Sequence, residues 1–106
     1  MNHAETNGKS SQRKFAMGRV LATPCALEAL EKSGESASAF LSRHARGDWG
    51  DVCPDDKRLN DEALIDGNRL LSAYKTSKGE RLWVITEAEG ERGYRAATTI
   101  LLPDEY

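Results

Sequence analysis

Apolar residues recur at helical spacing through the middle of the chain. The pair Thr23-Pro24 predicts a helix start, because threonine caps free amide groups and proline suits the first helical position. Ser36 and Pro54 mark two further starts, and each of the three segments runs into a glycine, which favours a helix end. We therefore expect three helices, over about residues 24–33, 36–46 and 54–66.

The last third of the chain changes to the two-residue alternation that is typical of strands. Arg69–Thr76 and Arg81–Glu87 alternate in this way, and the short turn between them contains Gly79, which predicts a hairpin. Ala97–Leu102 is a third β-rich segment. We expect an α+β fold in which N-terminal helices pack on a C-terminal three-stranded antiparallel meander. A short strand within Phe15–Ala22 is expected outside that meander.

The length of 106 residues suits one domain with one modest core. Residues 1–14 are polar and predict a disordered tail, which leaves residues 15–106 as a single α+β domain. The charged loop 88–95 is expected to be exposed and mobile.

The formal net charge of −2 argues against strong nonspecific binding to a nucleic-acid backbone. Residues 51–67 carry six acidic and two basic residues, so the third helix is acidic. Such a helix either meets a basic partner or is an ordinary solvated surface.

No apolar run approaches the roughly 20 residues that span a bilayer, and the start of the chain lacks the apolar core of a signal peptide. We therefore expect a cytoplasmic protein without membrane contact. Cys25 and Cys53 stand alone, which predicts free thiols and no zinc site. No motif points to another metal or to a cofactor.

The best candidate site is the run from His44 to Asp51, which contains an imidazole, a tryptophan, two glycines and two carboxylates. The residues predicted to bind a partner are His44, Asp48, Trp49 and Asp51. The imidazole titrates near neutrality, and a tryptophan is a frequent anchor in binding surfaces. The structural alternative is a helix–helix corner in which Trp49 fills the core and the carboxylates cap turns.

A second candidate surface is the predicted sheet, which carries Arg69, Lys75, Arg81 and Glu87. Antiparallel sheets often leave one face solvated, where basic residues can contact RNA or DNA phosphates. Ordinary solvated strand residues are the alternative, since Glu80 and Glu87 balance the charge.

Six short segments together form a recognisable pattern: Ala22-Thr23-Pro24, Ala26–Leu30, the Gly47-Asp48-Trp49-Gly50-Asp51 motif that follows His44, Leu71–Thr76, Trp83–Ala88 and Thr98–Pro103. In these segments the chain resembles a family of small bacterial proteins described as plasmid-related and found on mobile elements. The resemblance runs from about Phe15 to Tyr106. It brings no established activity, so no catalytic residue is carried over.

The leading hypothesis is a non-enzymatic accessory protein of bacterial mobile elements that binds another macromolecule and modulates host defence or gene expression. Another protein is the expected partner, contacted by the Trp49 loop and the acidic third helix, and nucleic acid is less favoured. One alternative is a small ribonuclease in which His44 is the general base and basic strand residues hold the phosphate. The other is a DNA-binding regulator whose first two helices form a helix-turn-helix.

Overall fold

The computed structural model describes residues 12–106. Within that range the chain forms three α-helices, one four-stranded sheet and a final 3-10 turn, in an α+β arrangement. The helices are α2 (Pro24–Ser33), α3 (Ala37–Ala45) and α4 (Pro54–Asp66). The strands are β1 (Arg19–Ala22), β2 (Leu70–Lys75), β3 (Arg81–Thr86) and β4 (Ala97–Leu101), and the 3-10 turn is η1 (Pro103–Glu105).

The helix starts follow the capping residues that the sequence offers. The Thr23 side chain accepts a hydrogen bond from the Ala26 amide, and the Ser36 side chain accepts one from Ala39. These bonds satisfy amides that have no partner inside the helix. All three predicted helices are thereby confirmed to within a residue or so.

The sheet differs from the prediction. Strands β2, β3 and β4 form the expected antiparallel meander, but β1 pairs with β4 in parallel, and the strand order is β1-β4-β3-β2. The short strand expected within Phe15–Ala22 is β1, but it belongs to the same sheet, so the prediction of a three-stranded sheet that follows N-terminal helices was wrong. The physical reason is that β4, the parallel partner of β1, lies far away in the sequence. No short turn connects the two strands, so the local sequence does not indicate the pairing.

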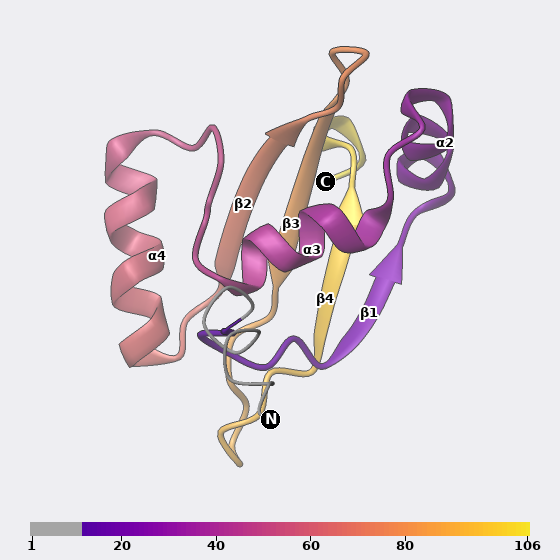
Figure 1. Cartoon of the computed structure of the whole chain (residues 1–106). Helices are drawn as coiled ribbons and strands as arrows, with labels where there is room; N and C mark the ends of the chain where they lie inside the picture. The colour runs from indigo at the N-terminus through magenta and orange to yellow at the C-terminus, as the bar shows by residue number, and fades with distance from the viewer. Residues whose placement is uncertain (1–11) are drawn as a thin grey trace, which may run out of the picture.

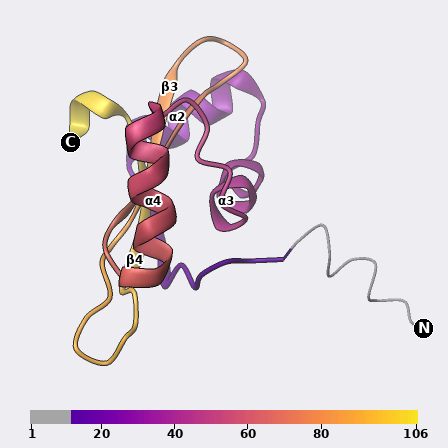
Figure 2. The same ribbon diagram turned by 90° about the vertical axis from the view of Figure 1, so that its left-hand side faces the viewer.

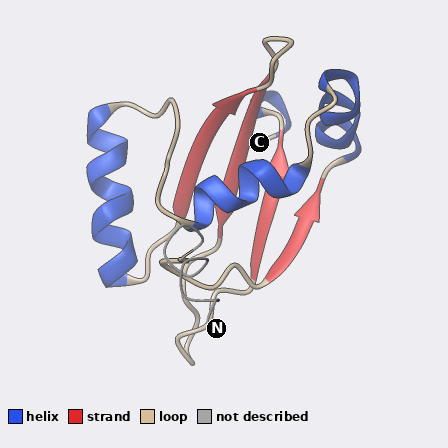
Figure 3. Ribbon diagram, in the orientation of Figure 1, coloured by secondary structure: helices blue, strands red, loops and turns tan. Residues whose placement is uncertain are grey.

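The helices take different positions around this sheet. In Figure 1, α3 crosses one face, α2 lies at the end of that face beside β1, and α4 runs along the β2 edge. The turned view in Figure 2 places α3 and the C-terminal turn on opposite sides of the sheet. Figure 3 colours the helices blue, and with Figure 2 it shows that the short η1 turn is the only helical segment of residues 12–106 on the face opposite α3.

Two clusters of buried side chains hold the layers together. The larger one joins α2 and α3 to the sheet, and its largest members are Phe40, Tyr74, Leu82 and Ile100. The smaller one lies where α4 meets β2 and is built on Trp49, Ala63 and Leu70, with Phe15, Val52 and Leu64 packed against them.

Most of the predicted tail, residues 1–11, lies outside the described residues. From Lys14 onward the chain is attached to the fold, because the Lys14 amide donates a 2.8 Å hydrogen bond to the carbonyl of Ala45. None of the helices in residues 12–106 has the length and apolar character that crossing a membrane requires.

Candidate functional site

His44 lies on α3 and is completely buried against the sheet. Its Nδ1 atom is 2.6 Å from Ser72 Oγ on β2, and its Nε2 atom is 2.8 Å from Thr86 Oγ1 on β3. The rings of Phe15 and Trp49 pack edge-on against the imidazole, at centroid distances of 5.1 and 5.7 Å. Both ring nitrogens therefore have partners inside the protein.

The hydrogen bonds around His44 have a definite direction. The Thr98 hydroxyl donates to the carbonyl of Met17 at 2.7 Å, so it must accept from Thr86 across their 2.7 Å contact. Thr86 has then used its only hydrogen and accepts from His44 Nε2–H. The chain therefore makes Nε2 a donor. Nδ1 accepts from the Ser72 hydroxyl when the imidazole is neutral.

Burial, with a smaller contribution from the positive charge of Arg95, lowers the pKa of His44 to about 4. At neutral pH the ring is therefore uncharged and has no access to solvent. A general base must come within hydrogen-bond reach of the proton it removes, and this imidazole reaches only its own partners. The geometry makes His44 a structural link between helix and sheet. Its nitrogens bond strand hydroxyls, not the following turn.

Trp49 is buried next to His44, with only 4 % of its surface exposed. Its indole N–H donates to Asp61 Oδ1 of α4 at 3.0 Å. This bond attaches the segment of residues 47–51, which we call the corner, to that helix. Its carbonyl accepts from the Ala73 amide, and the Asp51 amide donates to the Ala73 carbonyl. The corner thus adds one short parallel bridge to the outer edge of β2.

Gly50 is the residue that allows this close approach. It has a positive φ of 75°, and a Cβ placed there would lie 2.1 Å from the Ala73 carbonyl oxygen. No other residue type fits without moving the corner away from β2. The second glycine of the motif is therefore required by packing against the strand.

Asp48 and Asp51 are the exposed members of the predicted site. Asp48 forms an ion pair with Arg43, at 2.7 Å between Nε and Oδ2, and this hydrogen bond lowers the pKa of the carboxyl. The Tyr74 hydroxyl donates to the Asp48 carbonyl at 2.6 Å. The structure therefore brings His44 and Trp49 together inside the protein and leaves the two carboxylates on the surface.

Arg95 is a buried residue that the sequence analysis did not single out. The loop 88–95 was expected to be exposed, yet Arg95 is only 6 % exposed, and its guanidinium donates to the carbonyls of Asn68, Glu87 and Ala63 at 2.7 to 3.1 Å. The Ala63 carbonyl belongs to the last turn of α4, where a cation also complements the helix dipole. The expectation was wrong at this residue because charge in a loop usually predicts exposure.

The sheet face opposite α3, which we call the open face, has no α-helix across it within residues 12–106 and carries only the short η1 turn. Tyr106 packs edge-on against Trp83 at 5.7 Å, and the guanidinium of Arg69 lies over the Tyr106 ring. Two hollows, of about 170 and 240 Å³, are formed along this face. The strand residues lining them are Ala73, Tyr74, Lys75, Arg81, Trp83, Ile85, Thr99 and Leu101, with Asp51, Arg69, Glu87 and Tyr106 at the margins.

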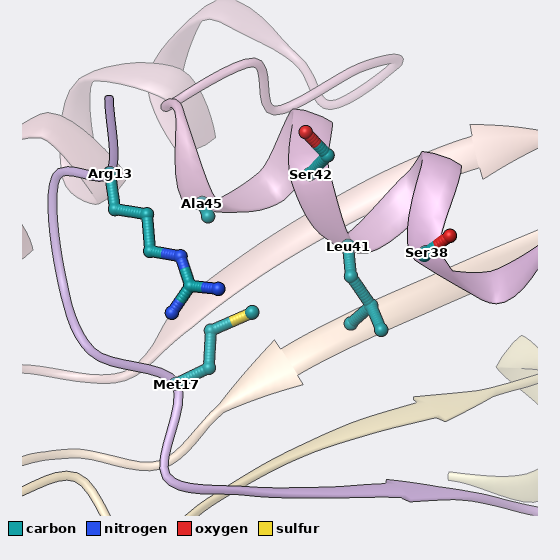
Figure 4. A pocket seen from close by; sticks show the side chains of 6 residues that line it. All are labelled: Arg13, Met17, Ser38, Leu41, Ser42 and Ala45. Atoms are coloured by element: carbon teal, nitrogen blue, oxygen red, sulfur yellow. The ribbon is translucent and has the colours of Figure 1, made fainter. Parts of the chain in front are cut away.

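A larger hollow of about 470 Å³ lies between α3 and the segment before β1. Figure 4 shows the Arg13 guanidinium and the Met17 side chain reaching into it toward Leu41, whereas Ser38 and Ser42 extend from the outer side of α3. One exposed cation over an apolar floor does not define a ligand. Among residues 12–106, no three His, Cys, Asp or Glu side chains gather where a metal ion would need them.

Comparison with models of protein families, with curated proteins and with solved structures found no match to this chain. The resemblance to plasmid-related proteins therefore stays a prediction.

Proposed function

We propose that this protein is a non-enzymatic binding module that contacts another protein through the open face of its sheet. The observation that carries the proposal is a set of aromatic and basic residues on a face that no α-helix of residues 12–106 crosses: Trp83, Tyr106, Arg69, Lys75 and Arg81. Tryptophan, tyrosine and arginine are the residues most enriched among the energetic centres of protein interfaces.

The site residues support binding better than catalysis. The ribonuclease alternative needs His44 as a base, and that imidazole is buried with both nitrogens occupied. The regulator alternative needs a helix free to enter a groove, whereas α3 packs across the sheet through Phe40 and His44. The basic strand residues that would hold the phosphate do line the open face, but His44 packs on the other face of the sheet.

The contact surface proposed here differs from the one expected at Trp49. The indole is inside the protein and offers a partner no exposed anchor. The Asp48 and Asp51 carboxylates border the corner, and Asp51 also lines one hollow of the open face. These two residues therefore belong to the margin of the proposed surface.

A protein partner fits the charges better than a nucleic acid does. Asp51 and Glu87 line the same hollows as the basic residues, and the whole chain has a net charge of −2. A single-stranded nucleic acid favours a continuous positive groove with stacked aromatics. The role as an accessory protein of bacterial mobile elements is part of the proposal and rests on the resemblance alone. The cytoplasmic location is also part of the proposal and rests on the lack of a long apolar run in the sequence.

The test compares the double variant Lys75→Glu/Arg81→Glu with the wild type and with Lys32→Glu/Lys57→Glu. The second variant makes the same change of charge on the exposed surfaces of α2 and α4. Partners are captured from cells by crosslinking and identified, and the affinity of each purified partner for the three proteins is then measured.

We expect one protein partner to lose at least tenfold in affinity for the open-face variant and to bind the control like the wild type. Circular dichroism verifies that all three proteins fold. Equal binding by all three would reject the open face as the contact surface. Capture of nucleic acid in place of protein, lost on nuclease treatment, would reject the protein partner.

A further inference from the structure

The outer edge of β1 presents backbone groups that have no partner among residues 12–106. The Arg19 amide donates to Ala96 and the Thr23 amide donates to Ile100, so the odd-numbered residues of this strand face β4. By the alternation of a strand, the amides and carbonyls of Val20 and Ala22 face away from the sheet. In Figure 1, β1 forms the right-hand edge of the sheet, and within residues 12–106 no strand pairs with its outer side.

The opposite edge of the sheet is protected. The Asn60 side chain bonds both backbone groups of Leu71, and the corner residues Trp49 and Asp51 bond those of Ala73. Proteins usually block sheet edges in such ways, because a free edge recruits other strands. The β1 edge has no such cover in residues 12–106, and Val20 and Leu21 remain 48 % and 41 % exposed.

We propose that two copies of this chain associate through β1, antiparallel and around a two-fold axis at Leu21. In this register Val20 of one copy lies opposite Ala22 of the other, and their outward amides and carbonyls pair. The two Leu21 side chains then meet at the axis. A single sheet of eight strands results, and its two edges are the protected β2 strands.

Charge complementarity is the reason to assign a second copy of the chain to this edge. In the same register Arg19 lies opposite Thr23 of the other copy. The Thr23 hydroxyl donates to the carboxylate of Glu105 at 2.7 Å, which keeps that negative charge beside the strand. Arg19, Leu21 and Thr23 share the face of the sheet on which η1 lies, so Arg19 of each copy meets Glu105 of the other. The symmetric pairing therefore contains two ion pairs.

The inference concerns the edge of the sheet and is independent of the function proposed for the open face. Its first test is sedimentation velocity over a wide concentration range. Val20→Pro removes an outward amide, which the monomer does not use, and Leu21→Lys places two like charges at the axis. Arg19→Glu replaces each proposed ion pair by the repulsion between two carboxylates, because Glu105 of the other copy is also negative. Ile65→Lys, at an 87 % exposed position on α4, is the matched control.

We expect the wild type and the Ile65→Lys control to dimerise with rising concentration. We expect each β1 variant to weaken the dimer about a hundredfold, because every change counts twice in a symmetric interface. A wild type that stays monomeric at near-millimolar concentration overturns the proposal. A dimer that all three β1 variants leave intact overturns it as well.

Crosslinking gives a second readout that does not depend on destabilising the interface. Two residues facing each other in a non-hydrogen-bonded antiparallel pair lie close enough for a disulfide. Leu21→Cys, with Cys25 and Cys53 replaced by serine, should form a covalent dimer rapidly under mild oxidation. Ile65→Cys in the same background is the control, and equal crosslinking rates would reject the register.

Discussion

The side-chain amide of Asn60 hydrogen bonds both backbone groups of Leu71, with Nδ2 donating to the carbonyl at 2.8 Å and the amide donating to Oδ1 at 3.1 Å. The amide of one helical side chain thus takes the place of a neighbouring strand at the edge of β2. Asn60 is 4 % exposed, although it lies on the acidic helix α4. The acidic helix α4, whose sequence is typical of a solvated surface, is therefore attached to the sheet at a specific residue.

Asn60→Ala should destabilise the fold and expose this edge. Two hydrogen bonds are lost and two backbone groups are left without partners, which corresponds to a loss of about 2 kcal/mol in the free energy of unfolding. Urea unfolding measures the loss. Glu62→Ala, at an exposed position two residues further on, removes only a surface ion pair and should change stability by less than about 0.5 kcal/mol. Equal effects of the two substitutions would contradict the attachment.

Gly50→Ala should be much more harmful than the same change at Gly79. Both glycines have positive φ, of 75° and 89°, so both variants carry the cost of a left-handed alanine, about 1 kcal/mol. Only at Gly50 does the new Cβ meet the Ala73 carbonyl and the Tyr74 ring, whereas nothing lies within 4 Å at Gly79. We expect a total loss of about 3 kcal/mol or more at Gly50. Thermal and urea unfolding of the two variants compare the costs, and similar values would show that the corner moves freely.

His44 should make the protein less stable in mild acid. The unfolded chain protonates this side chain near pH 6.5, whereas the folded protein resists protonation down to about pH 4. Between these values the unfolded state binds more protons, so stability is complete above pH 6.5 and falls as the pH drops to about 4. The full difference is on the order of 3 kcal/mol.

The measurement is the free energy of unfolding at several pH values for the wild type and for His44→Gln. The variant is less stable throughout, because it disturbs the bonds to Ser72 and Thr86, but the part of the slope that belongs to the imidazole should disappear. Parallel pH profiles for the two proteins would show that His44 titrates normally in the fold.

Local sequence signals predict most of the helices and strands, but they do not predict the pairings between distant parts of the chain. Thr23, Ser36 and the hairpin at Gly79 act within a few residues, so their effects can be predicted from the residues themselves. The parallel partner of β1 and the three carbonyls around Arg95 come from distant parts of the chain, and nothing in the local pattern specifies them.

The candidate site also combines local and long-range features. The run from His44 to Asp51 predicts a corner in which Trp49 fills the core, and the structure buries Trp49 there. The partners of His44 are hydroxyls on two different strands, which the local pattern does not specify. A solvated sheet face is among the predicted surfaces, but the position of α4 at its edge comes from long-range packing.

Arg95 should control both stability and the titration of His44. Arg95→Met removes the guanidinium bonds to three carbonyls, of which that of Ala63 keeps the Gly67 amide as a donor, and we expect a loss of about 3 kcal/mol in the free energy of unfolding. Removing the positive charge should also raise the pKa of His44 from about 4, since that charge is the second cause of its depression. NMR titration of the His44 ring measures the shift, and Arg92→Met, at an exposed position of the same loop, is the control. If Arg95→Met destabilises the fold but leaves the His44 pKa unchanged, the guanidinium acts only as a hydrogen-bond donor to the backbone, and burial alone keeps the imidazole neutral.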